Sequence, residues 1–368
     1  MKKETLNYLL ITTFVLLLIT VNSMSMVANQ EQTHPRHGGT LTFARISDAT
    51  QLDPHTTTAH PSRRVFELVY NTLVGLSPKM LPQPELAKSW EISDDGKTYT
   101  FNLRENVKFH NGETMTSEDV AFTLRRILDE DTGAAVRSNF TVIEEIRSPD
   151  PYTVVFELKR PFASFLVYLA DPNAVIVNKE VAKEGDLNRI ENAIGTGPFQ
   201  LSEWDTDEKM VLNANQEYYE EDKPYLDKIV FRIIPEPFSI VAALRANRVA
   251  FALLEQPTAA ISIKRTKGVN LATEPSLRYT PIFINTSRPP LDNVKVRKAM
   301  NYAIDRERII STAMLGEGNP TGPIPPALSY WAVELENFPY YKGQNLDKAK
   351  ELMSEAGFGK KGFSINLL

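Results

Sequence analysis

The pattern of apolar and polar positions indicates that short strands and amphipathic helices alternate along most of the chain. Four stretches show the two-residue alternation of a half-buried strand, and they cover 40–44, 99–103, 152–158 and 229–233. Residues 90–92 are predicted as a further strand. Apolar residues at 65, 68, 69, 73 and 76 have nearly helical spacing and predict a helix over 63–76. Further helices are predicted over 240–250 and 347–356, and after Asp292 with apolar residues at 296, 299, 300, 303 and 304.

Turn and capping residues mark several boundaries of these elements. Asp95-Gly96 suits a hairpin turn between two strands. Thr116 to Asp119 has the form of a capping box, followed by a stripe at 120, 124, 127 and 128. Residues 148–151 predict a turn, and 363–368 the start of a strand. Mixed strands and helices in this order predict an α/β protein of more than one domain.

The first residues have the composition of a secretory signal peptide. Lys2 and Lys3 precede an apolar stretch, and small residues follow at Ser23, Ser25 and Ala28. The strongly apolar part is shorter than the roughly 20 residues of a membrane-spanning helix. We therefore expect residues 1–28 to be a Sec-type signal peptide, 29–37 to be a linker, and the protein to be periplasmic or otherwise extracytoplasmic.

Composition narrows the possible functions. The chain has 368 residues, a net charge of −5 and no cysteine. The absence of cysteine excludes disulfides, thiolate metal sites and a lipid anchor attached through cysteine. The negative net charge gives no electrostatic support for binding nucleic acid, so we expect no such partner.

The sequence shows no motif that predicts catalysis, a cofactor or a metal. His34, His37, His55 and His60 lie close together in sequence, but their spacing fits no common ligand pattern, and we interpret them as polar loop residues. In Gly195-Thr196-Gly197-Pro198, the proline lacks the N–H group that a phosphate-binding loop uses, so we interpret this stretch as a structural turn. An envelope hydrolase remains an alternative of another class, although no nucleophile or metal motif favours it.

Several segments resemble the family 5 extracellular solute-binding proteins, which include the oligopeptide, dipeptide and nickel receptors of ABC importers. The matching segments occur in family order from about residue 38 onwards. They are Leu52-Asp53-Pro54-His55, 86–104, 107–112, 117–120, 195–199, 296–306 and 349–358.

This resemblance implies a two-lobed, type II periplasmic-binding-protein-like α/β fold that closes on its ligand. Lobe I would comprise 38–76 and 195–284, an inserted subdomain 77–194, and lobe II 285–368. Family members usually continue beyond this point. We therefore expect lobe II to be incomplete and the chain to be a fragment with weak or no ligand binding. The implied partners are a peptide or other small solute and an ABC permease with its ATPase, and we expect a monomer.

The resemblance also implies ligand-binding positions. Thr58 and His60 follow the Leu-Asp-Pro-His segment. A second stretch contributes Ser276, Arg278, Tyr279 and Phe283. Peptide is the leading ligand, and a nickel chelate, haem, sugar or opine on the same fold are the alternatives. The alternative for these six residues is that they are simply loop residues.

Overall fold

A computed structural model describes residues 35–274, 276–277, 279–328, 332–341, 343–359 and 362–365. The expected signal peptide and most of the expected linker lie outside these residues. None of the helices within the described ranges has the length and apolar character needed to cross a membrane.

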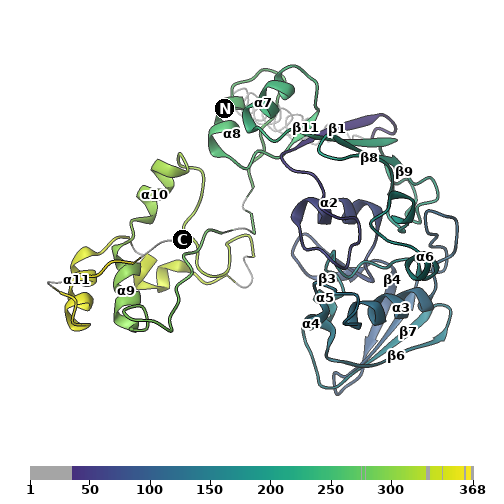
Figure 1. Cartoon of the computed structure of the whole chain (residues 1–368), viewed down its shortest axis with the longest axis horizontal. Coiled ribbons are helices and arrows are strands. Elements are labelled where there is room, and N and C mark those ends of the chain that lie inside the picture. The colour runs from purple at the N-terminus through teal and green to yellow at the C-terminus, as the bar shows by residue number, and fades with distance from the viewer. Residues whose placement is uncertain are drawn as a thin grey trace, which may run out of the picture. The chain divides into compact units, whose positions relative to one another are not determined.

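The first part of the described chain, up to residue 192, contains the whole of one sheet, a short strand pair and the first strand of another sheet (Figure 1). Its elements are β1 Thr40–Arg45, α2 His60–Val69, β2 Val74–Leu76, β3 Pro82–Pro84, β4 Ala87–Ile92, β5 Thr98–Leu103, α3 Ser117–Leu128, α4 Arg137–Phe140, β6 Ile143–Asp150, β7 Thr153–Leu158, α5 Phe165–Tyr168, α6 Lys179–Glu184 and the 3-10 helix η1 Ile190–Asn192. The elements that follow are β8 Phe199–Asp205, β9 Lys209–Ala214, β10 Lys228–Ile233, α7 Pro237–Arg245, β11 Phe251–Ala252, α8 Pro257–Ile263, α9 Val294–Ala303, α10 Arg306–Ala313, the 3-10 helices η2 Leu335–Asn337 and η3 Pro339–Tyr341, and α11 Leu346–Glu355.

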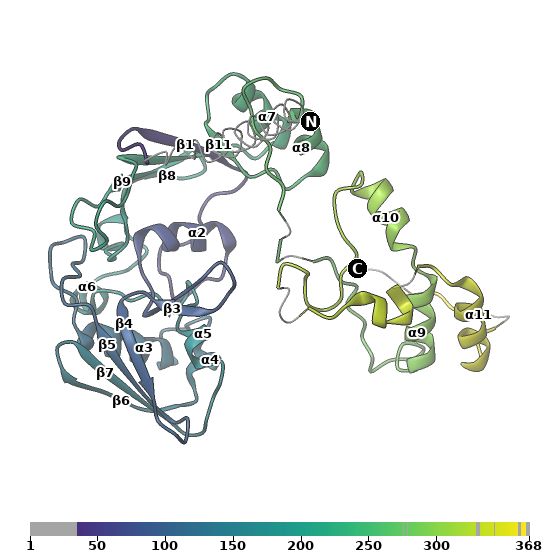
Figure 2. The same cartoon turned by 180° about the vertical axis from the view of Figure 1, so that it is seen from behind.

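The first sheet has the strand order β11-β1-β10-β9-β8. β1 runs parallel to both β10 and β11, whereas β9 runs antiparallel to both β10 and β8. Because side chains alternate along a strand, Phe43 packs in the core that α2 shares, while Ala44 packs with α7 and α8. Figures 1 and 2 show α7 and α8 beside the β1 and β11 end of this sheet.

The second sheet is antiparallel, with the order β4-β5-β7-β6. Helix α3 packs on it, against β6 and β7 (Figure 1). The core between them contains Phe101, Phe156 and Phe165, whose rings meet edge to face. A short pair, β2 with β3, completes this part of the fold.

The C-terminal elements have a much smaller core. Helices α9 and α11 pack together through Ala299, Ala349 and Leu352. An ion pair of 3.0 Å between Lys295 and Glu355 also joins these two helices. The folding energy of this region therefore rests on few buried apolar atoms.

Several predicted elements are confirmed. β1, β4, β5, β7 and β10 lie where alternation predicts strands, and Gly96 occupies the hairpin turn at φ +67°. Helix α3 begins directly after Thr116, and Gly195 to Pro198 lead into β8. Helix α11 is followed by Gly357 at φ +86°.

Other predicted boundaries are wrong. The helix expected over 63–76 ends at Val69, because the backbone becomes extended at Tyr70, and Leu76 belongs to β2. The helix expected over 240–250 spans 237–245, beginning at a proline and ending before Asn247 at φ 54°.

Three smaller corrections concern turns and caps. Residues 148–150 belong to β6 and only the two residues after them form the turn. Asn293 caps α9 in place of Asp292, because its side chain accepts from Lys295 N. Residues 362–365 form no strand, and 366–368 lie outside the described chain.

Candidate functional site

The predicted binding residues Thr58 and His60 lie where the loop after β1 enters α2. This loop leaves the carboxyl end of β1, next to the carboxyl ends of the parallel strands β10 and β11. Ligands of open α/β sheets bind at such strand ends. Thr58 is exposed, and His60 is exposed at the first position of α2.

A buried ion pair anchors the middle of this loop to α3. The two guanidinium Nη atoms of Arg126 donate to the two carboxylate oxygens of Asp53, at 3.2 and 2.6 Å. Such two-point pairing fixes both side chains in one orientation. Asp53 is buried, so its partner is needed to offset the loss of hydration.

His55 is also buried and extends the same network. Arg126 Nη1 lies 2.7 Å from His55 Nδ1, and His55 Nε2 lies 3.1 Å from Val175 O. Arginine can only donate, so Nδ1 accepts and the proton is on Nε2. Burial, followed by the charge of Arg126, lowers the pKa of His55 to about 4. His55 is therefore a polar residue of the loop between β1 and α2, as predicted, but it is buried and hydrogen-bonded there.

Hydrogen bonds to main-chain carbonyls hold both sides of Thr58. Asn173 Nδ2 donates to Pro54 O at 2.6 Å and to Thr57 O at 2.5 Å. Arg45 Nη2 donates to Pro61 O at 2.5 Å. Thr58 and His60 therefore lie on a segment whose neighbours are fixed before any ligand arrives, which reduces the entropy lost on binding.

Arg45 supports this loop from the end of β1. Its guanidinium lies 4.6 Å from the centroid of the Phe231 ring, and only 6% of the residue is exposed. Burial lowers the pKa of Arg45 to about 10, and the nearby Asp48 carboxylate opposes that shift. Arg45 consequently remains a cation at neutral pH.

The second predicted stretch has a different character. Ser276, Tyr279 and Phe283 are exposed and belong to no helix or strand. Phe283 is 91% exposed and Tyr279 44%, so both rings are open to contact. Arg278 lies outside the described residues. The assignment of these positions and of Thr58 and His60 to one ligand stays a prediction.

The residues that support the loop were harder to find from the sequence. Asp53 and His55 stand in a recognisable segment, but Arg126, Asn173 and Val175 are 71 to 120 positions from their partners. The described ranges contain no group of three His, Cys, Asp or Glu residues placed to hold a metal ion. His34 lies outside those ranges.

The glycine-rich turn has a structural role. Gly197 N donates to Val69 O at 2.9 Å, and a Cβ atom on Gly195 or Gly197 would overlap the last carbonyls of α2. His110 Nε2 lies 3.0 Å from Gly197 O, and burial lowers the pKa of His110 to about 4.

Comparison with known proteins identifies the class. Residues 82–367 match the bacterial extracellular solute-binding proteins, family 5 (middle part), and the chain belongs to this family. Its fold is the type II periplasmic-binding-protein fold, as expected.

Particular relatives are between 27% and 32% identical to the chain. The chain is 32% identical over 322 residues to the glutathione-binding protein GsiB of Salmonella paratyphi A, covering 87% of this chain and 62% of GsiB. Among solved structures it resembles AppA of Bacillus subtilis, an oligopeptide-binding protein in complex with a nonapeptide (TM-score 0.75, 27% identity, 88% and 65% coverage). It also resembles AgaA of A. tumefaciens R10 in complex with agropinic acid (TM-score 0.71, 32% identity, 87% and 65% coverage). The chain thus spans less than two thirds of the length of these relatives.

Proposed function

We propose that this chain acts as the extracytoplasmic solute-capturing component of an ABC importer, and that its solute is a peptide. Membership of family 5 supports the capture role. The main support for the proposal is the loop that contains Thr58 and His60. It lies at the carboxyl ends of β1, β10 and β11, and hydrogen bonds to its backbone hold it in place. Capture needs no covalent chemistry, and we propose no enzymatic activity. Delivery to a permease would follow closure of the two lobes.

Similarity to peptide-binding relatives supports peptide as the solute class. GsiB is named for glutathione, and AppA was solved with a nonapeptide. The opine alternative has its own observation, because AgaA was solved with agropinic acid at 32% identity. A nickel chelate is represented by NikZ of Campylobacter jejuni, solved with Ni(L-His) at 25% identity.

Equilibrium binding tests this proposal. The purified chain, and a chimaera that joins it to the C-terminal remainder of GsiB, are titrated with a tri- to pentapeptide pool, glutathione, agropinic acid and Ni(L-His). We expect the chimaera to bind peptides with a Kd of about 1 μM, which corresponds to a binding free energy of about −8 kcal/mol. The isolated chain should bind more weakly, since it would present fewer ligand contacts.

Variants in the loop test its part in binding. Thr58→Ala and His60→Ala should each weaken peptide binding by the chimaera about three- to tenfold, or about 0.6–1.4 kcal/mol. Thr206→Ala, in the turn between β8 and β9, is the matched control. Preference for agropinic acid or Ni(L-His) over every peptide, or no binding of any solute by a folded chimaera, would contradict the proposal.

A further inference from the structure

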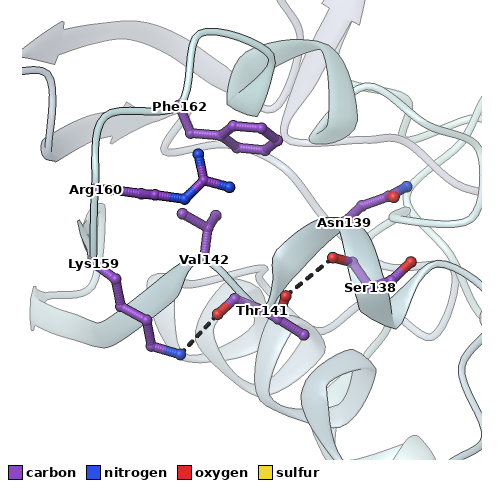
Figure 3. A pocket seen from close by; sticks show the side chains of 7 residues that line it. All are labelled: Ser138, Asn139, Thr141, Val142, Lys159, Arg160 and Phe162. Atoms are coloured by element: carbon purple, nitrogen blue, oxygen red, sulfur yellow. Dashed lines mark hydrogen bonds between the residues drawn. The ribbon is translucent and has the colours of Figure 1, made fainter.

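A small hollow on the predicted inserted subdomain gathers unused hydrogen-bond donors and positive charge. It lies between α4, the residues that follow α4, and the connection from β7 to α5, and its volume is about 160 Å³. Ser138, Asn139, Thr141, Lys159, Arg160 and Phe162 line it (Figure 3). These elements are separate from the loop that carries Thr58 and His60.

The cations of the hollow are only partly used by the protein. Within the described chain, the Arg160 guanidinium has one recorded contact, with its Cζ 5.5 Å from the Phe162 ring centroid. Lys159 Nζ donates to Thr141 O at 2.8 Å, which leaves two of its three protons available. The lining includes no carboxylate, and Lys159 and Arg160 are both exposed residues.

Neutral donors stand across the hollow from Arg160. The side chains of Ser138 and Asn139 line the opposite wall, and neither has a recorded side-chain hydrogen bond among the described residues (Figure 3). The Thr141 hydroxyl donates to Ser138 O at 3.1 Å, which holds the turn after α4. Residues of two separate segments thus line one hollow.

The backbone that carries the cations is held in place. Lys159 N donates to Val142 O at 2.9 Å, and Tyr99 Oη donates to Phe162 O at 3.4 Å. The ring of Phe162 packs against Tyr168 with centroids 5.6 Å apart. Arg160 therefore stacks on a fixed ring, and the site needs little reorganisation to bind an anion.

We propose that this hollow is a binding site for a single small oxyanion of the phosphate class. Drug-sized ligands need roughly 300–1,000 Å³, so a space of about 160 Å³ suits one compact group. The planar guanidinium matches two phosphate oxygens at once, and the ammonium adds a point charge. Asn139 and Ser138 would donate to the remaining oxygens. The group could belong to free phosphate or to a lipid headgroup, which share this chemistry.

Calorimetric titration of the purified chain with inorganic phosphate at constant ionic strength tests the proposal. We expect saturable one-to-one binding with a Kd of about 1 mM or tighter. Arg160→Gln should weaken it at least tenfold and Asn139→Ala about threefold. Arg147→Gln is the matched control, because Arg147 is an exposed arginine already paired with Glu157, and it should leave binding unchanged. Circular dichroism establishes that each variant folds.

Co-sedimentation with vesicles identifies the source of the phosphate group. Arg160-dependent binding to phosphatidylglycerol vesicles, and not to phosphatidylcholine vesicles, would assign a lipid headgroup. Binding of free phosphate alone would assign a soluble ion. The proposal would be overturned if neither the phosphate titration nor the vesicle experiment showed saturable binding. It would also be overturned if a folded Arg160→Gln variant bound as well as the wild-type chain. These outcomes are independent of peptide capture.

Discussion

Gly195 and Gly197 flank Thr196. Because neither has a side chain, the backbone of this segment can contact the backbone at the end of α2. Gly197→Ala would place a methyl group against Leu68 O, which cannot move without breaking the last turn of the helix. We expect the free energy of unfolding to fall by about 2–4 kcal/mol, measured by urea denaturation. At Gly185 the obstructing atoms belong to the side chain of Asn192, which can rotate away. Gly185→Ala should therefore cost clearly less, and an equal cost would contradict this explanation.

Burial of His55 makes stability depend on pH. Its pKa is about 4 in the folded chain against 6.5 for the ordinary group, so the unfolded chain takes up the proton first as the pH falls. The stabilisation is complete above about pH 6.5 and is lost progressively down to about pH 4. Between pH 7 and pH 5 the wild-type chain should lose about 1–2 kcal/mol through His55.

The variant His55→Gln tests this pH dependence. It should be less stable at pH 7, because a buried network loses a member, but its stability should change less between pH 7 and pH 5. Urea denaturation at the two pH values measures the difference. His110, whose pKa burial also lowers to about 4, should contribute a loss of the same sign that remains in the variant. Equal slopes for the two proteins would show that His55 does not titrate as described.

At the scale of elements, the start of α3 is held by a buried carboxylate. Asp119 Oδ2 accepts from Thr116 N at 2.9 Å and from Thr116 Oγ1 at 3.0 Å, and Asp119 Oδ1 accepts from Lys179 N at 3.2 Å. Glu118 and Asp119 are neighbours in the first turn of this helix. Only Glu118 is exposed, whereas Asp119 joins α3 to α6.

Substitution of these two neighbours should therefore have unequal effects. Asp119→Ala should lower the free energy of unfolding by about 2 kcal/mol, because it removes a cap and leaves buried donors unpaired. Glu118→Ala should cost no more than about 0.5 kcal/mol, which is the size of a helix-dipole interaction at an exposed first turn. Thermal and urea denaturation of both variants measure the contrast, and equal losses would be inconsistent with these roles.

The same elements show how far sequence patterns extend. Alternation of apolar and polar residues located β5 and β10 because one face of each strand is more buried than the other. The hairpin turn at Asp95-Gly96 and the helix start at Thr116 could be predicted because each depends on residues close together in the sequence. The helix pattern over 63–76 failed at its end because α2 stops where Gly197 crosses it, a contact 128 positions away in the chain. The network around Asp53 was hidden for the same reason. A ligand loop could be located from the sequence, but not the side chains that fix it.

At the scale of the whole molecule, the described chain contains cores of very different size. The sheet β4-β5-β7-β6 and the sheet containing β1 both bury aromatic and aliphatic side chains. By contrast, the buried residues of the cluster joining α9 and α11 are two alanines and one leucine, with Tyr302 and Met353 partly buried against them. Burying a leucine contributes roughly 1.5–3 kcal/mol, while ordering the backbone costs roughly 1–2 kcal/mol for each residue. The C-terminal elements should therefore have much lower stability when nothing further packs on them.

Hydrogen exchange measured by mass spectrometry tests this last prediction. Amides of β5, β7 and β10 should remain protected for hours, while those of α9, α10 and α11 exchange within minutes, because local opening costs less where little apolar surface is buried. Limited proteolysis should cut first within 271–283, where the described residues are exposed and without helix or strand. The chimaera with the remainder of GsiB should slow exchange in α9 to α11 and leave β5 unchanged. Equal protection across the isolated chain would mean that the small cluster is not the weak point.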